Sequence, residues 1–296
     1  MTISAWSGPL ISYGDSGPES GPSLFIGGSG VLDPRPFYTY KTGQDFGSVT
    51  AGFLGSNPIM TVNQVPSALA ANNIATSQTP VSGTAVTLTA GTGVTGSTTI
   101  TNAATGFAVT GLLALDGAAG RVSYGTSGTI QLWDPTKALS RVVTITTAAG
   151  DTAVYTVRGF DIYGFPMTES ITANGATTVS GKKAFKYVQS VTPVGTVGAT
   201  ITVGTGDVFG FPIYSATFVI GATADVAISW NGAAITATTG YLAGVTTNPA
   251  TAITGDVRGT YAVQSASDAT KRLVITQSPA LANVASVTGL FGVSQF

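Results

Sequence analysis

Few residues in this chain could carry out catalysis, because it contains no histidine and no cysteine. Those absences exclude Ser-His-Asp and Cys-His nucleophilic catalysis and zinc sites built on His or Cys. The two glutamates are Glu19 and Glu169, and Asp161 lies shortly before Glu169. Two carboxyl groups can hydrolyse a glycosidic bond, so Asp161 and Glu169 are the candidate catalytic pair. A structural role as turn residues is the simpler interpretation, and we predict no catalytic residue and no enzyme activity.

Six aspartates beyond residue 48 lie within two positions of glycine or proline, which is typical of turns in which the carboxylate accepts a backbone N–H bond. No Asp-x-Asp spacing occurs, so the sequence offers no compact loop of oxygen ligands for calcium. We therefore predict neither a metal site nor a cofactor. The six turn aspartates are Asp116, Asp134, Asp151, Asp161, Asp207 and Asp256.

Two patterns resemble phosphate-binding loops by their letters alone. GTGVTG at 91–96 has the dinucleotide-binding spacing, but the next residues, STTIT at 97–101, predict a strand where that motif requires a helix. Gly181-Lys182 ends like a P-loop, but Gly175 is one position too far upstream and Lys183 replaces the required Ser or Thr. Neither pattern supports nucleotide binding.

The balance of charge argues against two classes of partner. The formal net charge is −1, with no basic stripe for a nucleic-acid backbone. No apolar run is long enough to span a bilayer, so we expect no membrane partner. The one basic cluster, Lys182, Lys183 and Lys186, is interpreted as a solvated strand edge protected by lysines.

Aromatic residues suggest packing more than ligand binding. Trp133, Trp230 and Tyr241 could form a carbohydrate platform, but packing in a core or interface is the expected role. The first 45 or so residues are rich in Gly, Pro and Ser yet keep recurring aromatics, unlike a disordered linker. We interpret this segment as an extended arm that packs on its own domains or on a neighbouring subunit. The candidate interface residues of the arm are Trp6, Tyr13, Phe25, Phe37, Tyr38 and Tyr40.

After the arm, short runs of Thr, Val, Ile and aromatics alternate with turn residues, which predicts sandwiches or barrels. Three hairpins are expected, turning at Asn231-Gly232, at Asn174-Gly175 and through 148–151. In the strand at 141–146 the side chains on the two faces differ little in polarity, as expected in a sheet that is packed on both sides. Short helices are possible at 134–139 and at 67–75.

The predicted fold is therefore all-β, with tandem small sandwich-like or barrel-like units preceded by an extended N-terminal arm. The predicted boundaries give an arm at 1–48, a charge-poor β unit at 49–135, a sandwich-like unit at 136–214 and a C-terminal β unit at 215–296. An internal echo relates YGFPM at 163–167 to FGFPI at 209–213, each following an Asp. It is interpreted as duplicated turn chemistry, with both prolines at strand ends or edges.

Residues 46–115 contain no charged side chain, and charged residues make up 8% of the chain, against about 25% in ordinary soluble domains. Mixed surface charge normally opposes association. A protein that lacks it is expected to hold much of its surface against other subunits. We therefore interpret 46–115 as the contact module.

Six further segments combine turn and strand signatures: LDGAAGRV at 115–122, WDPTKA at 133–138, GFDIYGFPM at 159–167, GKKAFKY at 181–187, GDVFGFP at 206–212 and GDVRGTY at 255–261. Together they resemble a family of tailed-bacteriophage virion proteins, and the similarity covers about residues 55–296. The resemblance implies a non-enzymatic capsid decoration or cement subunit on the virion surface, made in the host cytoplasm. Its implied partners are the major capsid protein and copies of itself. A tail, baseplate or receptor-binding fibre component is the alternative.

Overall fold

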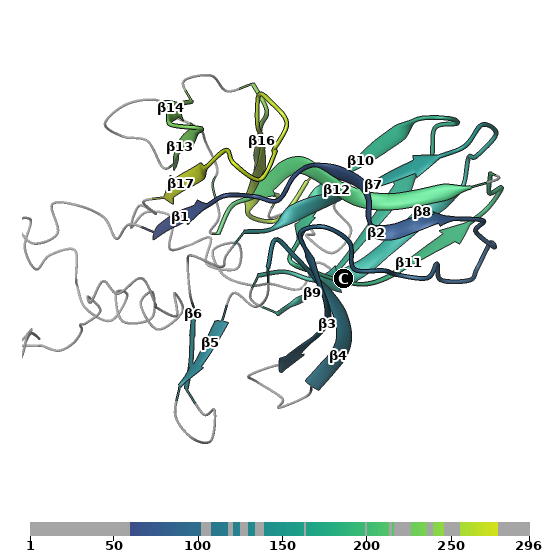
Figure 1. Ribbon diagram of the computed structural model, residues 1–296, viewed down its shortest axis with the longest axis horizontal. Helices are drawn as coiled ribbons and strands as arrows, with labels where there is room; N and C mark the ends of the chain where they lie inside the picture. The colour runs from purple at the N-terminus through teal and green to yellow at the C-terminus, as the bar shows by residue number, and fades with distance from the viewer. Residues whose placement is uncertain are drawn as a thin grey trace, which may run out of the picture.

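The regular structure of the chain is β-strand, which confirms the predicted all-β fold class (Figure 1). The structure, a computed structural model, contains no helix in the residues it describes. Those residues are 60–101, 108–117, 121–124, 130–133, 139–162, 164–198, 200–212, 215, 226–235, 239–245 and 255–277. The predicted arm and its six aromatic residues, Trp6, Tyr13, Phe25, Phe37, Tyr38 and Tyr40, lie outside them.

Seventeen strands are described, and every pairing between them is antiparallel. In chain order they are β1 (Met60–Gln64), β2 (Ala70–Gln78), β3 (Val94–Thr101), β4 (Ala108–Leu115), β5 (Arg121–Tyr124), β6 (Ile130–Trp133), β7 (Arg141–Thr147), β8 (Val154–Phe160), β9 (Pro166–Thr172), β10 (Thr178–Phe185), β11 (Tyr187–Val194), β12 (Ile201–Gly210), β13 (Val226–Trp230), β14 (Ala233–Ala234), β15 (Tyr241–Ala243), β16 (Gly259–Ala262) and β17 (Leu273–Gln277).

Two large sheets form a sandwich. The β12 sheet has the order β10-β7-β12-β16-β15, with β2 also paired to β12, and the β8 sheet has the order β3-β4-β11-β8-β9. Alternate residues of β8 and β9 point inward, the period expected of strands with one buried face. Their inward side chains, such as Tyr155 and Val157, share one core with Val143, Ile145 and Val203 of the facing sheet. Full burial of each such side chain stabilises the fold by about 1.5–3 kcal/mol.

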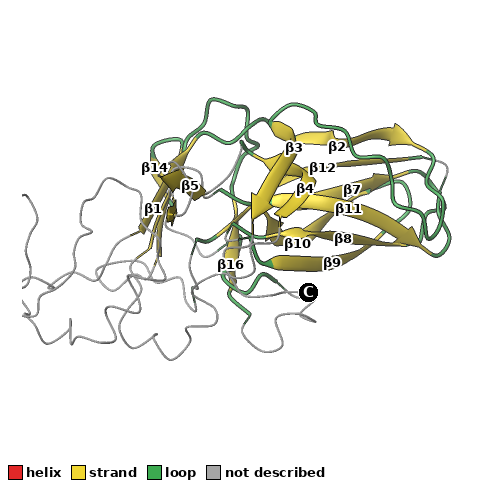
Figure 2. Ribbon diagram, turned by 90° about the horizontal axis from the view of Figure 1, so that it is seen from below, coloured by secondary structure: helices red, strands yellow, loops and turns green. Residues whose placement is uncertain are grey.

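The small sheet, with the order β1-β17-β13-β14, lies beside one end of this sandwich (Figures 1 and 2). Its inward side chains, including Val62, Ile228 and Leu273, build a second core. Phe209 and Phe211, at the end of β12, complete that core from the sandwich side. The two cores therefore meet along β12.

Strand β12 changes partner along one of its edges. Its first half, Ile201 to Thr205, pairs with β2, and its last three residues pair with β16. Between these two partners lie Gly206 and Asp207, where the pairing of β12 with β7 on its other edge also shifts register. The buried side chain of Arg141 binds at this irregular point.

One of the three predicted hairpins is confirmed. Trp230 pairs with Ala233 around Asn231 and Gly232, whose φ angles of 52° and 84° are those of the predicted type I′ turn. The predicted strand 226–230 matches β13.

The other two hairpin predictions are wrong, because each turn carries the chain from one sheet to the other. Strands β7 and β8, joined through 148–151, belong to the β12 sheet and the β8 sheet, as do β10 and β9, joined through Asn174-Gly175. Gly150 and Gly175 do adopt positive φ, of 85° and 59°. A positive-φ turn fixes a reversal of the chain, but the buried faces determine which strand becomes the partner.

The predicted helix at 67–75 is also wrong, since residues from Ala70 onward form strand β2 against β12. Tertiary pairing overrides the helical propensity of Ala and Leu here. The predicted double-sided packing of 141–146 is confirmed, because Arg141 to Ile145 are all buried. Of the predicted helix at 134–139, the structure describes Leu139 alone.

Strand pairing crosses the segment boundaries that the sequence suggested. Strand β1, from the 49–135 segment, pairs with β17, from the 215–296 segment. Strand β12, from 136–214, pairs with β2 and with β16, which lie in the other two segments. The sheets are therefore shared among the segments.

Candidate functional site

Many of the charged residues that the structure describes lie in the interior. Eight of those described are buried, although Lys, Arg, Asp and Glu are normally exposed. Burying a charge is costly unless it is paired and hydrogen-bonded, so each of these residues needs a specific partner. The eight are Arg141, Asp151, Asp161, Glu169, Lys183, Lys186, Asp256 and Arg258.

Arg141, the first residue of β7, is completely buried and uses all three guanidinium nitrogens. Its Nε donates to the carbonyl of Gly206 at 2.9 Å, and its Nη2 donates to Asp207 Oδ1 at 2.6 Å. Its Nη1 donates to the Ser67 carbonyl at 2.9 Å and lies 3.3 Å from both oxygens of Asp116. One cation therefore lies between two carboxylates.

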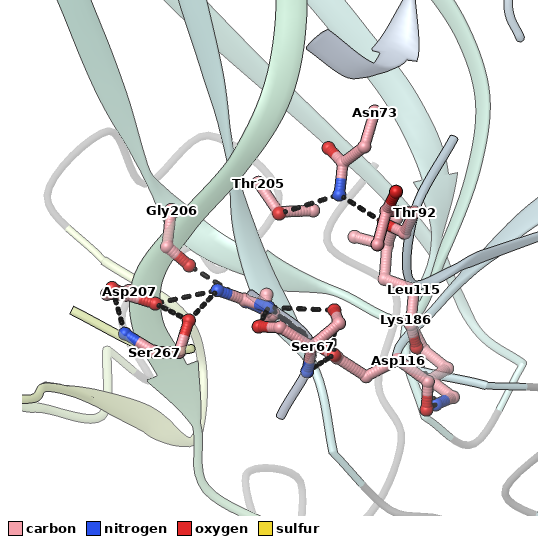
Figure 3. A network of polar contacts seen from close by, with 11 residues as sticks. Ser67, Asn73, Thr92, Leu115, Asp116, Lys186, Thr205, Gly206, Asp207 and Ser267 are labelled. Atoms are coloured by element: carbon pink, nitrogen blue, oxygen red, sulfur yellow. Dashed lines mark hydrogen bonds and ion pairs between the residues drawn. The ribbon is translucent and has the colours of Figure 1, made fainter. Parts of the chain in front are cut away.

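Two serines complete this cluster, one beside each carboxylate (Figure 3). Asp116 accepts the N–H and the hydroxyl of Ser67 at 2.7 and 2.5 Å. Asp207 accepts the N–H and the hydroxyl of Ser267 at 2.9 and 2.6 Å. We call Arg141, Asp116, Asp207, Ser67 and Ser267 the Arg141 cluster.

The Arg141 cluster joins segments from all parts of the fold. Ser67 follows β1 and Ser267 precedes β17, so both connect to the small sheet, while Asp116 follows β4 of the β8 sheet. Arg141 and Asp207 belong to the β12 sheet. The guanidinium also lies 5.0 Å from the ring centroid of Phe209, a residue of the second core, in cation–π geometry. The cluster thus fastens the small sheet to both sheets of the sandwich.

A second buried arginine has the same pattern of partners. Arg258 lies 2.8 Å from Asp161 Oδ2 and 3.6 Å from Asp256 Oδ1, and all three side chains are at most 1% exposed. Asp256 also accepts the backbone N–H of Arg258 and, across to β10, that of Ala184. We call Arg258, Asp161 and Asp256 the Arg258 cluster; it joins the turn between β8 and β9 to the start of β16.

A glutamate closes the seam where β9 and β10, the edge strands of the two facing sheets, meet. The pairing of β10 with β7 is irregular between Ser180 and Ala184, and Glu169 of β9 accepts the N–H groups of Lys182 and Lys183 there, at 2.5 and 3.3 Å. In return, Lys183 Nζ donates to the carbonyl of Thr168 at 3.0 Å. A Cβ on Gly181 would come within 2.5 Å of Glu169 Oε2, so a larger residue at this position would displace the carboxylate.

The environment of this seam shifts both of its titratable groups toward their neutral forms. Burial raises the pKa of Glu169 to about 7, and the nearby Asp256 adds to the rise, while the two N–H bonds and the Lys183 ammonium oppose it. Burial lowers the pKa of Lys183, against the attraction of Glu169 and Asp256. Such a pair could exchange a proton, but both groups are buried and are held by structural hydrogen bonds.

The candidate catalytic pair is not a free pair of carboxyl groups. Asp161 accepts the N–H of Phe165 through Oδ1 and binds Arg258 through Oδ2, and Glu169 binds the β10 backbone. The predicted strand edge protected by solvated lysines is correct for Lys182, which is exposed on the edge strand β10. It is wrong for Lys183 of the same strand, because Lys183 is buried. Lys186, which follows β10, is buried too and donates to the carbonyls of Leu115 and Asp116.

The prediction that the turn aspartates bind the N–H groups of their own turns is confirmed for Asp151, Asp161 and Asp256, whose N–H donors are Ala153, Phe165 and Arg258. It is wrong for Asp116 and Asp207, which accept the N–H groups of Ser67 and Ser267, 49 and 60 positions away, and Asp207 lies within strand β12. Asp134 lies outside the described residues. Sequence reasoning missed Arg141 and Arg258, the cations that compensate these acids, because they lie far from their partners along the chain.

The repeated motif at 163–167 and 209–213, which was interpreted as duplicated turn chemistry, has a different structural basis. Asp161 and Asp207 each bind a buried arginine, but Asp161 lies in a turn while Asp207 lies within strand β12. The two prolines occupy the predicted kind of position, Pro166 at the start of edge strand β9 and Pro212 just after β12.

The aromatic candidates contribute to packing where they are described. Trp230 is 5% exposed, lies 6.4 Å from Phe209 between ring centroids and donates its indole N–H to Ser265. Tyr241 is half-buried 5.8 Å from Phe211, with its hydroxyl beside Ser215. The side chain of Trp133 is not among those described.

The described residues contain no group of three or more acidic side chains placed to hold a metal ion. No helix of membrane-spanning length and apolarity occurs in the part of the chain that the structure describes. Comparisons with protein-family models, with curated proteins and with solved structures found no match for this chain.

Proposed function

We propose that this protein is a non-enzymatic structural protein of a tailed-bacteriophage virion, a decoration or cement subunit of the capsid. It clamps neighbouring copies of the major capsid protein, contacts copies of itself, and works on the capsid surface after synthesis in the host cytoplasm. The resemblance to phage virion proteins supports this proposal, and the structure adds a physical reason for the segments that carry it.

Those segments contain most of the buried charge. Of the eight buried charged residues, five lie within them: Asp161, Lys183, Lys186, Asp256 and Arg258. The partly buried Asp116 and Asp207 of the Arg141 cluster lie within them too. The segments that looked like plain turn signatures therefore hold the polar contacts that join the sheets. A subunit that clamps its neighbours must be rigid, because a force applied at one face must be transmitted to the opposite face. The polar contacts between the sheets would keep the sheets together under such a force.

The observation that supports the proposal is that few of the described charged side chains are exposed on the surface. Of the described charged residues whose side chains are placed, four are exposed, and none of these lies in β2, β3 or β4. Exposed charges would have to be desolvated when another subunit covers them, at a cost that pairing does not always recover. Neutral surfaces of Thr, Ser and Ala avoid this desolvation cost. They therefore favour a permanent interface with neighbouring subunits over a free monomer.

The test is the position of the protein on the particle. Virions of the phage that encodes this chain should bind gold-labelled antibodies against it over the whole head. Labelling confined to the tail or its tip would reject the decoration role and select the alternative, a tail, baseplate or receptor-binding fibre component. Absence of the protein from purified virions would reject both.

A further inference from the structure

The chain contains two Asn-Gly pairs, Asn174-Gly175 and Asn231-Gly232, and both asparagines are exposed. In such a pair the asparagine side chain is open to attack by the backbone nitrogen of the next residue, because glycine has no Cβ to hinder the approach. The two pairs are chemically equivalent. Any difference in reactivity between them must therefore come from the fold around each one.

The peptide group between Asn174 and Gly175 is held at both of its polar atoms. The Gly175 N–H donates to the carbonyl of Asp151 at 3.0 Å, and the Asn174 carbonyl accepts the Thr177 hydroxyl at 2.7 Å. The Gly175 carbonyl in turn accepts the Thr177 N–H at 2.9 Å and the hydroxyl of Thr147. A rotation that turned the Gly175 nitrogen toward the Asn174 side chain would break several of these bonds together.

The peptide group between Asn231 and Gly232 is held far less firmly. Neither the Asn231 carbonyl nor the Gly232 N–H has a hydrogen bond to any residue that the structure describes. The turn leads into β14, which has two exposed residues and lies at the end of the small sheet. A Cβ built on Gly232 would meet no atom within 4 Å, so the turn is open to solvent. Segments with so few contacts open locally at a low cost in free energy.

We propose that Asn231 is a site of spontaneous deamidation and that the fold protects Asn174 from this reaction. The backbone nitrogen of Gly232 attacks Asn231 Cγ and forms a C–N bond, which closes a five-membered imide ring. The side-chain amide nitrogen leaves as ammonia and takes the proton that the backbone nitrogen loses. One water molecule then cleaves either C–N bond of the ring, giving aspartate or isoaspartate. The net reaction exchanges an amide and water for a carboxylic acid and ammonia.

The reaction places a new carboxylate on an exposed hairpin of the small sheet. Asn231 donates its own N–H to the carbonyl of Arg272 at 2.8 Å, and Arg272 is one of the few exposed charged residues that the structure describes. Isoaspartate also lengthens the backbone of a two-residue turn by one methylene, which disturbs the pairing of Trp230 with Ala233. This inference does not depend on the virion role, because it concerns the chemistry of the chain itself.

Peptide mass spectrometry of the aged protein tests the proposal. The full-length protein would be incubated in mildly alkaline buffer, and conversion at Asn231 and Asn174 would be followed in the same samples. Asn231 should convert at least tenfold faster than Asn174. A parallel incubation in concentrated urea removes the fold, and there the two rates should become similar. Equal rates in the folded protein, faster conversion of Asn174, or conversion of Asn231 in urea alone would overturn the proposal.

A matched pair of variants provides the second readout. Glutamine keeps the amide but closes its ring more slowly, because the ring needs one more atom. Anion-exchange chromatography of aged wild type should show an acidic form with one added negative charge. Asn231→Gln should reduce this form at least fivefold, whereas Asn174→Gln should leave it unchanged. The opposite pattern, or an acidic form that survives Asn231→Gln, would contradict the assignment of Asn231.

Discussion

Arg141 and Asp207 are adjacent in space, 2.6 Å apart between Nη2 and Oδ1, at the point where β12 changes partner from β2 to β16. The arginine donates to the Gly206 carbonyl at the same point. A side chain thus takes the place of a missing strand partner. The same guanidinium holds the loops beside Ser67 and Ser267, so this pair links the small sheet to the sandwich.

Arg141→Met should destabilise the protein by about 3–5 kcal/mol, the usual cost of removing one partner from a buried ion pair. Both Asp116 and Asp207 would keep their charge in the interior without the cation. Urea unfolding of the full chain measures the effect. Lys182→Met is the control, since Lys182 is exposed on β10 and the substitution keeps the backbone N–H that Glu169 accepts, and it should change stability by no more than about 0.5 kcal/mol. Equal effects of the two variants would show that Arg141 holds nothing together.

Asp161 and Arg258 should be coupled energetically. In a double-mutant cycle with Asp161→Asn and Arg258→Met, the two changes should fail to add by about 0.5–3 kcal/mol, as expected of residues in direct contact. Pairing Asp161→Asn with Arg141→Met serves as the control cycle and should be additive within about 0.5 kcal/mol. Additivity in both cycles would contradict the ion pair between Asp161 and Arg258.

Glu169 should make stability depend on pH. Burial raises its pKa in the folded protein to about 7 from an ordinary value of 4.5, so the folded state binds this proton more tightly than the unfolded state. The resulting stabilisation is fully present below pH 4.5 and is lost as pH rises through about 7. Urea midpoints of wild type and Glu169→Gln should therefore diverge across this range, with wild type losing stability relative to the variant. Parallel curves would show that Glu169 does not titrate there.

Charge placed on the contact module, residues 46–115, should impair attachment to the particle before it impairs folding. Thr76→Lys combined with Thr84→Lys adds two cations at exposed positions of the 46–115 segment. The double variant should unfold at the wild-type urea concentration yet occupy particles at a lower level. Thr152→Lys with Thr172→Lys, also at exposed threonines, is the control outside that segment. Wild-type occupancy by the Thr76/Thr84 variant would show that the missing charge has no role in assembly.

Local signals in the sequence predicted the strand character and the turn at Asn231-Gly232, because both depend on residues a few positions apart. They did not predict that 148–151 and Asn174-Gly175 connect different sheets. The backbone of each turn could connect two strands of one sheet or two strands of different sheets. The packing of strands that are distant in the sequence decides which of these occurs. The sandwich topology therefore required information that no short window contains.

The buried clusters show the same limit. Asp161 was recognisable as a turn residue and binds a backbone N–H group there, whereas Asp207, expected in a turn, lies within strand β12. Their pairing with arginine was not visible, since Arg141 and Asp207 are 66 positions apart and Arg258 and Asp161 are 97 apart. The low charge content suggested a neutral surface, but it gave no sign that the remaining charges are used to hold the interior together.

The copy number of this protein in the virion tests the central claim most directly. Quantitative mass spectrometry of purified particles would measure its molar ratio to the major capsid protein. A decoration subunit predicts a ratio of the same order as that of the capsid lattice itself, with hundreds of copies in each particle. A ratio corresponding to a single ring or spike of subunits, or no protein at all in the particle, would contradict the account.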